Sequence, residues 1–139
     1  MKIDLHIHTK SCSDGNLSIE EVFQEAKNRN IDLMSTTDHD CIDCQERAIA
    51  LARKHGISYI TGVELNVTFN YPDEDKAISL DFLGYGYDIH NQELKNKLQL
   101  IKEHRERRAR QILEKLNVEF DKEGSEKFTE KDLKNIQDS

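Results

Sequence analysis

His6 and His8, two histidines separated by one residue, open the set of residues in this sequence that could carry chemistry. They end a short apolar segment that we expect to form a β-strand, on which residues two apart point to the same side. The two imidazoles could therefore bind one metal ion together. Asp14 ends the polar run that follows and would bring a carboxylate back over the strand end. The alternate apolar positions of the strand would face the packing: Ile3, Leu5 and Ile7.

An isolated His-x-His motif is usually a pair of ordinary histidines, but here two later apolar segments also end in metal-ligating residues. The segment 31–37 is followed by Asp38 and His39, and the segment 57–63 by Glu64. Parallel α/β folds place their active sites at the C-terminal ends of their strands. Five ligand-type side chains exceed what one tetrahedral structural site needs, and their nitrogen and oxygen atoms suit manganese, iron or zinc. We predict a catalytic centre of two or three ions, with Glu64 able to bridge two.

Two or three cations held together would lower the pKa of a bound water and clamp a phosphoryl group for in-line attack. The expected reaction is therefore hydrolysis of a phosphate ester by metal-activated water. The substrate would be a phosphorylated small molecule or a short nucleic acid, because mononucleotides, bisphosphorylated nucleotides, short RNA and histidinol phosphate all present the same phosphoryl chemistry.

The elements that must position these residues alternate between strands and helices. Ser18 and Glu21 form a capping-box pattern, and apolar residues follow at helical spacing over about 18–29. After the second strand, another helical pattern ends at Gly56. This β-α-β-α-β order predicts a parallel sheet with right-handed crossovers and helices outside it.

The second half of the chain predicts a hairpin and a long helix. The third strand continues past Glu64 and would pair with the segment 77–85 across a turn at 71–76, which holds Pro72, the only proline. A helix is expected over about 91–116.

Arg105 and Arg108 interrupt the apolar stripe of this helix at its own spacing. They could point inward toward something anionic, because guanidinium groups fit phosphate oxygens in a bidentate geometry. The simpler alternative is a solvated face, with the arginine stems lying over the surface. Beyond the helix we expect a loop over 124–127 and a short helix that Thr129 and Asp132 could cap.

Composition predicts a soluble, cytoplasmic protein without a membrane segment. The 139 residues are enough for one domain with a hydrophobic core, and 36% of them are apolar and 34% charged. No segment approaches the length of a membrane span, and no signal peptide or anchor is visible. The net charge of −7 gives no general attraction for nucleic acid. A phosphate-bearing substrate would therefore be attracted locally, by metal ions or by clustered arginines.

The three cysteines, Cys12, Cys41 and Cys44, do not indicate an extracellular disulfide framework. Cys41 and Cys44 form a C-x-x-C motif, but no second pair completes a zinc tetrad, and redox pairs with this spacing normally sit in a different strand context. We interpret the cysteines as incidental residues near the mouth of the site, with a functional Cys41–Cys44 thiol pair as the alternative.

Taken together, these motifs resemble the PHP superfamily, named for polymerase and histidinol phosphatase. The resemblance covers essentially the whole chain, and the long helix after its last motif is similar to the branch of nucleotide phosphatases and 5′ to 3′ exoribonucleases. The motifs that carry it, in chain order, are His6-Ile7-His8, Ser13-Asp14-Gly15, Thr37-Asp38-His39, Gly62-Val63-Glu64 and Leu83-Gly84-Tyr85.

The resemblance implies an α/β fold, a distorted (β/α)7 barrel with a trinuclear manganese, iron or zinc centre. His6 and His8 would bind one ion, Glu64 would be shared with a second, and Asp14 and His39 would hold the third. Asp38 would orient the histidine that follows it rather than bind metal. By the same resemblance, two helix arginines would reach the substrate phosphate: Arg105 and Arg108.

Two departures from the family pattern affect this interpretation. Asp81 stands three residues before Gly84, where related sequences commonly carry a metal-binding histidine. An aspartate can still bind metal, so Asp81 is a sixth candidate ligand, but it is shorter and harder and would favour manganese. The later family motifs have no counterpart after His104, and a barrel of this type usually needs about 250 residues. The chain therefore looks like the N-terminal half of a barrel, with a barrel segment at residues 1–90 and a truncated helical segment at 91–139.

Two other classes of protein stay open beside a phosphoesterase. A metal-dependent amidohydrolase also carries His-x-His at the end of a first barrel strand but cleaves C–N or ester bonds. A non-catalytic metal-binding fragment would hold ions without turnover. Half a barrel would leave an open parallel strand edge, which invites pairing with another chain, so we expect self-association and little phosphoesterase activity from this chain alone.

Overall fold

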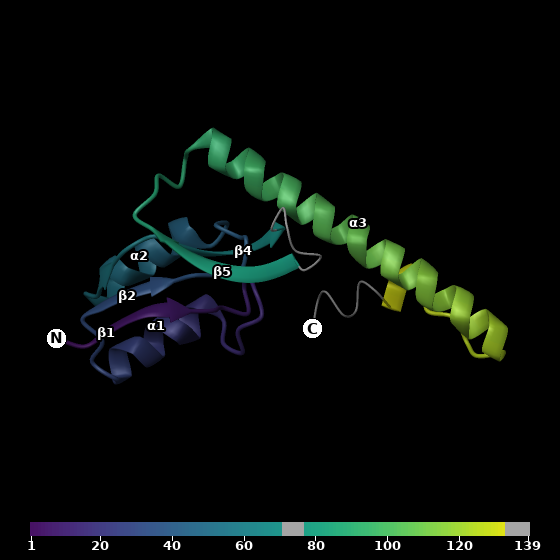
Figure 1. The fold of residues 1–139 in the computed structure, drawn as a ribbon. Coiled ribbons are helices and arrows are strands. Elements are labelled where there is room, and N and C mark those ends of the chain that lie inside the picture. Colours follow the sequence, from purple (N-terminus) through teal and green to yellow (C-terminus); the bar gives the residue numbers. More distant parts are fainter. Residues whose placement is uncertain (71–76, 133–139) are drawn as a thin grey trace. The chain divides into compact units, whose positions relative to one another are not determined.

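The computed structural model describes residues 1–70 and 77–132, and the predicted turn at 71–76 lies outside the described residues. The chain divides into two units, Met1–Leu98 and Gln99–Ser139. The elements of both are drawn in Figure 1 and are, in chain order, β1 (Ile3–Ile7), α1 (Ile19–Asn28), β2 (Leu33–Thr36), α2 (Gln45–His55), β3 (Ser58–Tyr59), β4 (Gly62–Asn70), β5 (Ala77–Tyr85) and α3 (Gln92–Glu123).

The first three strands form a parallel sheet in the order β1-β2-β3, which confirms the predicted parallel arrangement. Met34 on the central strand pairs with Asp4 on one side and with Tyr59 on the other. Parallel neighbours need crossover connections, and α1 and α2 provide them. Among the described residues, this sheet has three strands, and β1 lies at one open edge. The strands and helices of the predicted barrel segment are therefore present, but the described strands do not close into a barrel.

The two helices and the sheet share one hydrophobic core, as the helical patterns predicted. The Ser18 hydroxyl accepts from the Glu21 amide while the Glu21 carboxylate accepts from the Ser18 amide, so α1 begins with the predicted capping box. Gly56 ends α2 in the left-handed conformation, with φ of 68°. The buried core residues are Ile19, Val22, Phe23, Ala26, Met34, Ala48, Leu51, Ala52 and Ile57.

The predicted third strand is in fact two strands in two sheets, so its continuity was wrong. β3 is two residues long and pairs with β2, whereas β4 begins at Gly62 and pairs with β5 in the antiparallel direction. Gly62 lies opposite Tyr85 at one end of this pairing, and Asn70 lies opposite Ala77 at the other. The chain changes sheets at 60–61, because backbone groups there bond to different partners: the Ile60 amide donates to Met34 and the Thr61 carbonyl accepts from Gly86. The β4–β5 pairing itself confirms the predicted hairpin.

The apolar positions of β1 are less buried than predicted. Ile3 is 48% exposed, and Leu5 and Ile7 are intermediate. The reason is that β1 lies at the edge of the described sheet, with β2 as its sheet neighbour. The hairpin also carries exposed apolar side chains, among them Phe69 and Phe82, whose rings lie 6.3 Å apart.

Helix α3 is longer than predicted and ends at Glu123. The Asn91 side chain accepts from the Leu94 amide at its start, and Gly124 follows its end with φ of 69°. Its last turns carry a local contact that the sequence pattern did not reveal, because the Asn117 amide group bonds to both backbone groups of Phe128. The predicted loop over 124–127 is confirmed.

After this loop, Thr129 and Asp132 form the expected capping pair, with the Thr129 amide 2.7 Å from the Asp132 carboxylate. Helical structure begins at residue 130, and the rest of this predicted helix lies outside the described residues. No helix in the described part of the chain is both long and apolar enough to cross a membrane.

The interpretation of all three cysteines as incidental was wrong. Cys12 and Cys44 form a disulfide, with their Cα atoms 6.2 Å apart, while Cys41 is free. The C-x-x-C spacing drew attention to the pair that is adjacent in sequence. The loop after β1, however, folds onto the start of α2, so tertiary proximity selects Cys12 instead.

Candidate metal centre

The C-terminal ends of β1 and β2 and the start of β4 meet, as the order of the elements predicted. The Thr37 amide donates to the Ile7 carbonyl at 2.8 Å, which joins the end of β2 to the end of β1. His39 then forms a parallel bridge with Glu64, in which the Glu64 amide donates to Asp38 and the Asp40 amide donates to Glu64. These backbone bonds place residues far apart in sequence around one point.

Five of the six predicted ligand residues come together there, and we call His6, His8, Asp14, His39 and Glu64 the ligand cluster. Its first group consists of His6, His8 and Glu64. His6 Nε2 lies 3.0 Å from His8 Nε2 and 3.0 Å from Glu64 Oε2, and His8 Nε2 lies 2.8 Å from the same carboxylate oxygen. Three ligand atoms therefore converge on one point.

The second group consists of His8, Asp14 and His39, so His8 belongs to both. His8 Nδ1 lies 3.0 Å from Asp14 Oδ1, and His39 Nε2 lies 3.8 Å from Asp14 Oδ2. His39 Nδ1 also lies 3.6 Å from Glu64 Oε2. A carboxylate oxygen of Glu64 thus faces all three histidines.

The geometry of the first group suits a small divalent ion. In a tetrahedral site with metal–nitrogen distances near 2.0–2.1 Å, neighbouring ligand atoms are roughly 3.3 Å apart. The observed separations of 2.8–3.0 Å are slightly shorter, so little movement would admit an ion. The donor set of imidazoles and carboxylates is the one that manganese, iron and zinc share.

Burial differs sharply among the carboxylates of the site. The Glu64 side chain is 7% exposed and the Asp14 side chain 71%. For Asp14, burial slightly opposes ionisation, but bonds from the Ser13 hydroxyl and from its own backbone amide, together with His39 and His8, lower the pKa. A buried carboxylate such as Glu64 needs positive charge nearby, and the histidines or a bound cation would provide it.

Asp38 contacts a different residue from the one that the sequence suggested. Its carboxylate accepts from the backbone amide of Thr9 at 2.6 Å and from the Thr9 hydroxyl at 3.0 and 3.1 Å. Burial raises the pKa of Asp38, although the bonds from Thr9 oppose the shift. These contacts hold Thr9, the residue that follows His8 just after the end of β1.

The loop that carries Asp14 is fixed at several points. The Ser13 hydroxyl accepts from the His39 amide at 3.1 Å, and the disulfide ties Cys12 to α2. Gly15 packs so closely against the backbone of His8 that a Cβ would overlap the His8 carbonyl. Only glycine fits there, which explains the glycine of the Ser-Asp-Gly sequence.

A buried amide that the sequence analysis missed supports the start of β4. Gln45 is 1% exposed; its Nε2 donates to the carbonyls of Thr36 and Gly62, and its Oε1 accepts from the Tyr59 hydroxyl at 2.9 Å. Tyr87 donates to the same Gly62 carbonyl at 2.7 Å. Burial raises the pKa of both tyrosines, which keeps them neutral donors. The network therefore holds the backbone of β4 at Gly62, two residues before Glu64.

The sixth predicted ligand, Asp81, lies on β5 outside both groups. It accepts from the Asn66 side chain at 2.6 Å, and Asn66 is its pairing partner across the hairpin. Because Glu64 and Asn66 are two apart on β4, Asp81 and Glu64 lie on the same face of the hairpin. The two predicted substrate contacts, Arg105 and Arg108, are exposed on α3.

Comparison with known proteins gives the site a family context. A family model described as "PHP domain" matches residues 4–124. The chain is 36% identical over 110 residues to a 3′,5′-nucleoside bisphosphate phosphatase of Chromobacterium violaceum, an alignment that covers 79% of this chain and 36% of the relative. It is 34% identical over 115 residues to a 5′-3′ exoribonuclease of Haemophilus influenzae, covering 83% and 39%.

A solved structure agrees with the fold. It is described as an amidohydrolase from Chromobacterium violaceum with bound sulfate and no metal, and it matches with a TM-score of 0.70 and 35% identity over 85% of this chain and 39% of that one. The chain therefore spans between 36% and 39% of the length of these relatives.

Proposed function

Because the chain belongs to the PHP domain family, we propose that its ligand cluster binds two or three divalent ions and hydrolyses phosphate esters of nucleotides or short oligonucleotides. The observation that carries the proposal is the pair of three-residue ligand groups that share His8. Two relatives support the substrate class, since they are named as a nucleoside bisphosphate phosphatase and an exoribonuclease.

Each residue of the cluster has a proposed role. His6, His8 and Glu64 would hold one ion, and Glu64, which also faces His39, would be shared with a second. Asp14 and His39 would hold the third. Manganese, iron or zinc fits this mixture of nitrogen and oxygen ligands. A ligand role for Asp81 is supported by its place on the same face of the hairpin as Glu64.

A divalent ion at this site would lower the pKa of a water molecule and polarise a phosphoryl group. The chain's own residues prepare for that. Glu64 brings a buried negative charge that offsets part of the cations' charge. The contact of Asp14 with His8 Nδ1 orients the imidazole so that its Nε2 faces Glu64 and His6. Asp38 keeps the end of β1 in place through Thr9.

Arg105 and Arg108 are the proposed contacts to substrate phosphate. Planar guanidinium groups bind phosphate oxygens in pairs, which supports this role over a purely solvated one. Replacing either arginine with alanine is expected to weaken nucleotide binding and leave metal content unchanged. Unchanged nucleotide affinity in both variants would favour the solvated face.

The test is release of inorganic phosphate from adenosine 3′,5′-bisphosphate by the Mn²⁺-loaded chain, with Glu64→Gln as the inactive control. An amidohydrolase is the second candidate, because the matched Chromobacterium violaceum structure is described as one. Paired assays with nitrophenyl phosphate and nitrophenyl acetate separate the two. Hydrolysis of the acetate alone would favour the amidohydrolase, and metal binding without turnover of either would favour a non-catalytic metal-binding domain.

A cytoplasmic location and self-association through the open β1 edge complete the proposal. The location is supported by the substrate class, since nucleotides are intracellular metabolites. The Cys12–Cys44 disulfide argues the other way, because disulfides are rare in reducing compartments. Alkylation of free thiols in intact cells would decide this, and light scattering would show whether the chain forms dimers.

A further inference from the structure

We propose that the Cys12–Cys44 disulfide is a redox switch for the second group of the ligand cluster, which consists of His8, Asp14 and His39. The disulfide holds Asp14 in place to bind an ion, and its reduction frees the loop and lowers the metal affinity of this group alone. The inference rests on the proposed function, under which both groups bind divalent ions. It goes further by naming the element that controls one of them.

Asp14 is carried by a loop, whereas the other carboxylate of the cluster, Glu64, is on β4. It lies within residues 8–18, an irregular segment between β1 and α1, and its side chain is 71% exposed. The Lys10 amide donates to the Leu17 carbonyl at 2.7 Å and closes this segment on itself. That bond supports the local shape of the loop but does not fix where the loop lies against the rest of the protein.

Two contacts tie the residues just before Asp14 to the rest of the protein. The Ser13 hydroxyl accepts from the His39 amide at 3.1 Å. The disulfide joins Cys12, two positions before Asp14, to Cys44. Cys44 is a firm anchor, because it packs against the hydrophobic core and directly precedes α2. A single hydrogen bond contributes little net stability, so the covalent tie is the stronger of the two.

The first group of the cluster is held by other contacts. His6 belongs to β1, which pairs with β2, and Glu64 forms a parallel bridge with His39. These contacts do not involve residues 10–17. Reduction of the disulfide should therefore leave His6, His8 and Glu64 in place and affect the second group selectively.

The disulfide is open to chemical reduction, because Cys12 and Cys44 are both partly exposed. The reductant we propose is a dithiol. One of its thiolates attacks a sulfur of the disulfide, and its second thiol then resolves the mixed disulfide. The Cys12–Cys44 bond breaks and a disulfide forms in the reductant, which transfers two electrons and two protons to leave two cysteine thiols.

A reducible disulfide agrees with the proposed substrate class. Nucleotides are intracellular metabolites, and disulfides of proteins in reducing compartments are usually transient and catalytic or redox-sensing. The switch makes the Cys12–Cys44 bond compatible with a cytoplasmic location, because the bond would form only under oxidising conditions.

The test is isothermal titration of the full chain with Mn²⁺ in both redox states, under anaerobic conditions. The reduced chain is prepared with dithiothreitol, which is then removed. Alkylation confirms the two states, because Cys41 alone is free in the oxidised chain and all three cysteines are free in the reduced one.

Three variants accompany the titration. Cys12→Ser is the permanently open form, and Cys41→Ser, which keeps the disulfide, is its matched control. Asp14→Asn shows whether the effect passes through the carboxylate, because this variant should bind Mn²⁺ equally in both redox states.

We expect the oxidised chain to bind at least two Mn²⁺ ions. Reduction should weaken one of them by about 10- to 100-fold, the loss that follows when a metal ligand loses its supporting contact. The affinity for the other should change little, which also shows that the reduced chain keeps its fold. Cys12→Ser should behave like the reduced chain, and Cys41→Ser should respond to reduction as wild type does.

Unchanged affinity for both ions after reduction would overturn the switch, as would tighter binding. A single Mn²⁺ ion in the oxidised chain would also overturn it. So would an undiminished response to reduction in Asp14→Asn. Loss of both ions together with the helical circular dichroism signal would overturn it as well, because the disulfide would then support the whole fold.

The two proposals fail separately. Phosphate release by the Mn²⁺-loaded chain with metal binding that ignores the redox state would refute the switch and leave the proposed function intact. Redox-dependent binding of one ion without phosphate release would refute the proposed hydrolysis and leave the switch intact.

Discussion

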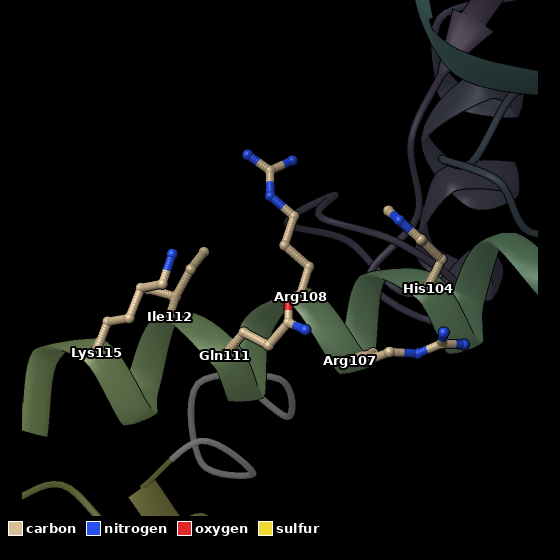
Figure 2. A pocket seen from close by; sticks show the side chains of 6 residues that line it. All are labelled: His104, Arg107, Arg108, Gln111, Ile112 and Lys115. Atoms are coloured by element: carbon tan, nitrogen blue, oxygen red, sulfur yellow. The ribbon is translucent and has the colours of Figure 1, made fainter.

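The ligand cluster and a row of exposed cations on α3 are built in opposite ways. We call Arg107, Arg108 and Lys115, which form this row and are shown in Figure 2, the basic row. His6 and Glu64 are 58 positions apart in sequence, yet their side-chain atoms lie 3.0 Å apart. The cluster takes its residues from β1, the loop after it, the end of β2 and β4, whereas the basic row lies on consecutive turns of α3. Geometry at the cluster therefore depends on tertiary packing, and geometry at the row depends on helix formation alone. Remote substitutions should affect the first and spare the second.

The largest expected effect is the loss of metal from Glu64→Gln. Glutamine keeps the shape of the side chain but removes the one buried charge that faces all three histidines. Changing a residue that only supports a ligand typically costs 10- to 100-fold in metal affinity, so we expect a loss of at least roughly 100-fold here. Isothermal titration with Mn²⁺ measures it. An affinity within threefold of wild type would remove Glu64 from the site.

The disulfide is the next strongest constraint, because it closes a loop of 32 residues that includes Asp14. Cys12→Ser should lower the free energy of unfolding by about 3–4 kcal/mol under oxidising conditions, from the added freedom of the unfolded chain. Denaturant titration measures this. Cys41→Ser is the matched control and should change little, and equal effects of the two variants would contradict the assigned pairing.

Gln45→Ala should destabilise the fold by about 2–3 kcal/mol, because it leaves buried carbonyls of Thr36 and Gly62 without their donor. Metal affinity should fall with it, since the network supports β4 before Glu64. Gln24→Ala, at an exposed position of α1, should stay within about 0.5 kcal/mol of wild type. If the two substitutions lower the free energy of unfolding equally, or if Gln45→Ala leaves metal affinity unchanged, the claim that the ligand cluster depends on tertiary packing is refuted.

The smallest effect is expected at the basic row. Arg107→Ala/Lys115→Ala should change the free energy of unfolding by less than about 0.5 kcal/mol, because both side chains are exposed and form no described ion pair. Bound Mn²⁺ should equal that of wild type. Loss of metal in this variant would show that the two regions are coupled.

The same contrast explains what the sequence could predict. His6 and His8 were predictable because strand geometry puts residues two apart on one side, and the capping box at Ser18 is equally local. That Glu64 and His39 meet followed from the alternation of strands and helices, which places parallel strand ends at one edge.

The parts that sequence patterns missed depend on contacts between distant segments. Gln45 resembles any polar residue in the first turn of a helix, and only the fold reveals that it is buried. The break between β3 and β4 falls at 60–61, inside a segment whose pattern is that of one strand, because a change of partner strand leaves no clear mark in composition. Cys12 was overlooked for the same reason, since its partner is chosen by proximity in space.

The most direct test of the central claim is X-ray diffraction at the zinc absorption edge from crystals grown with Zn²⁺. We predict an anomalous peak about 2.0–2.2 Å from His6 Nε2, His8 Nε2 and Glu64 Oε2, the distances at which zinc binds imidazole and carboxylate, and a further peak between Asp14 and His39. Anomalous peaks only elsewhere on the protein, with these five side chains in place and no density between them, would contradict the assignment of a metal centre.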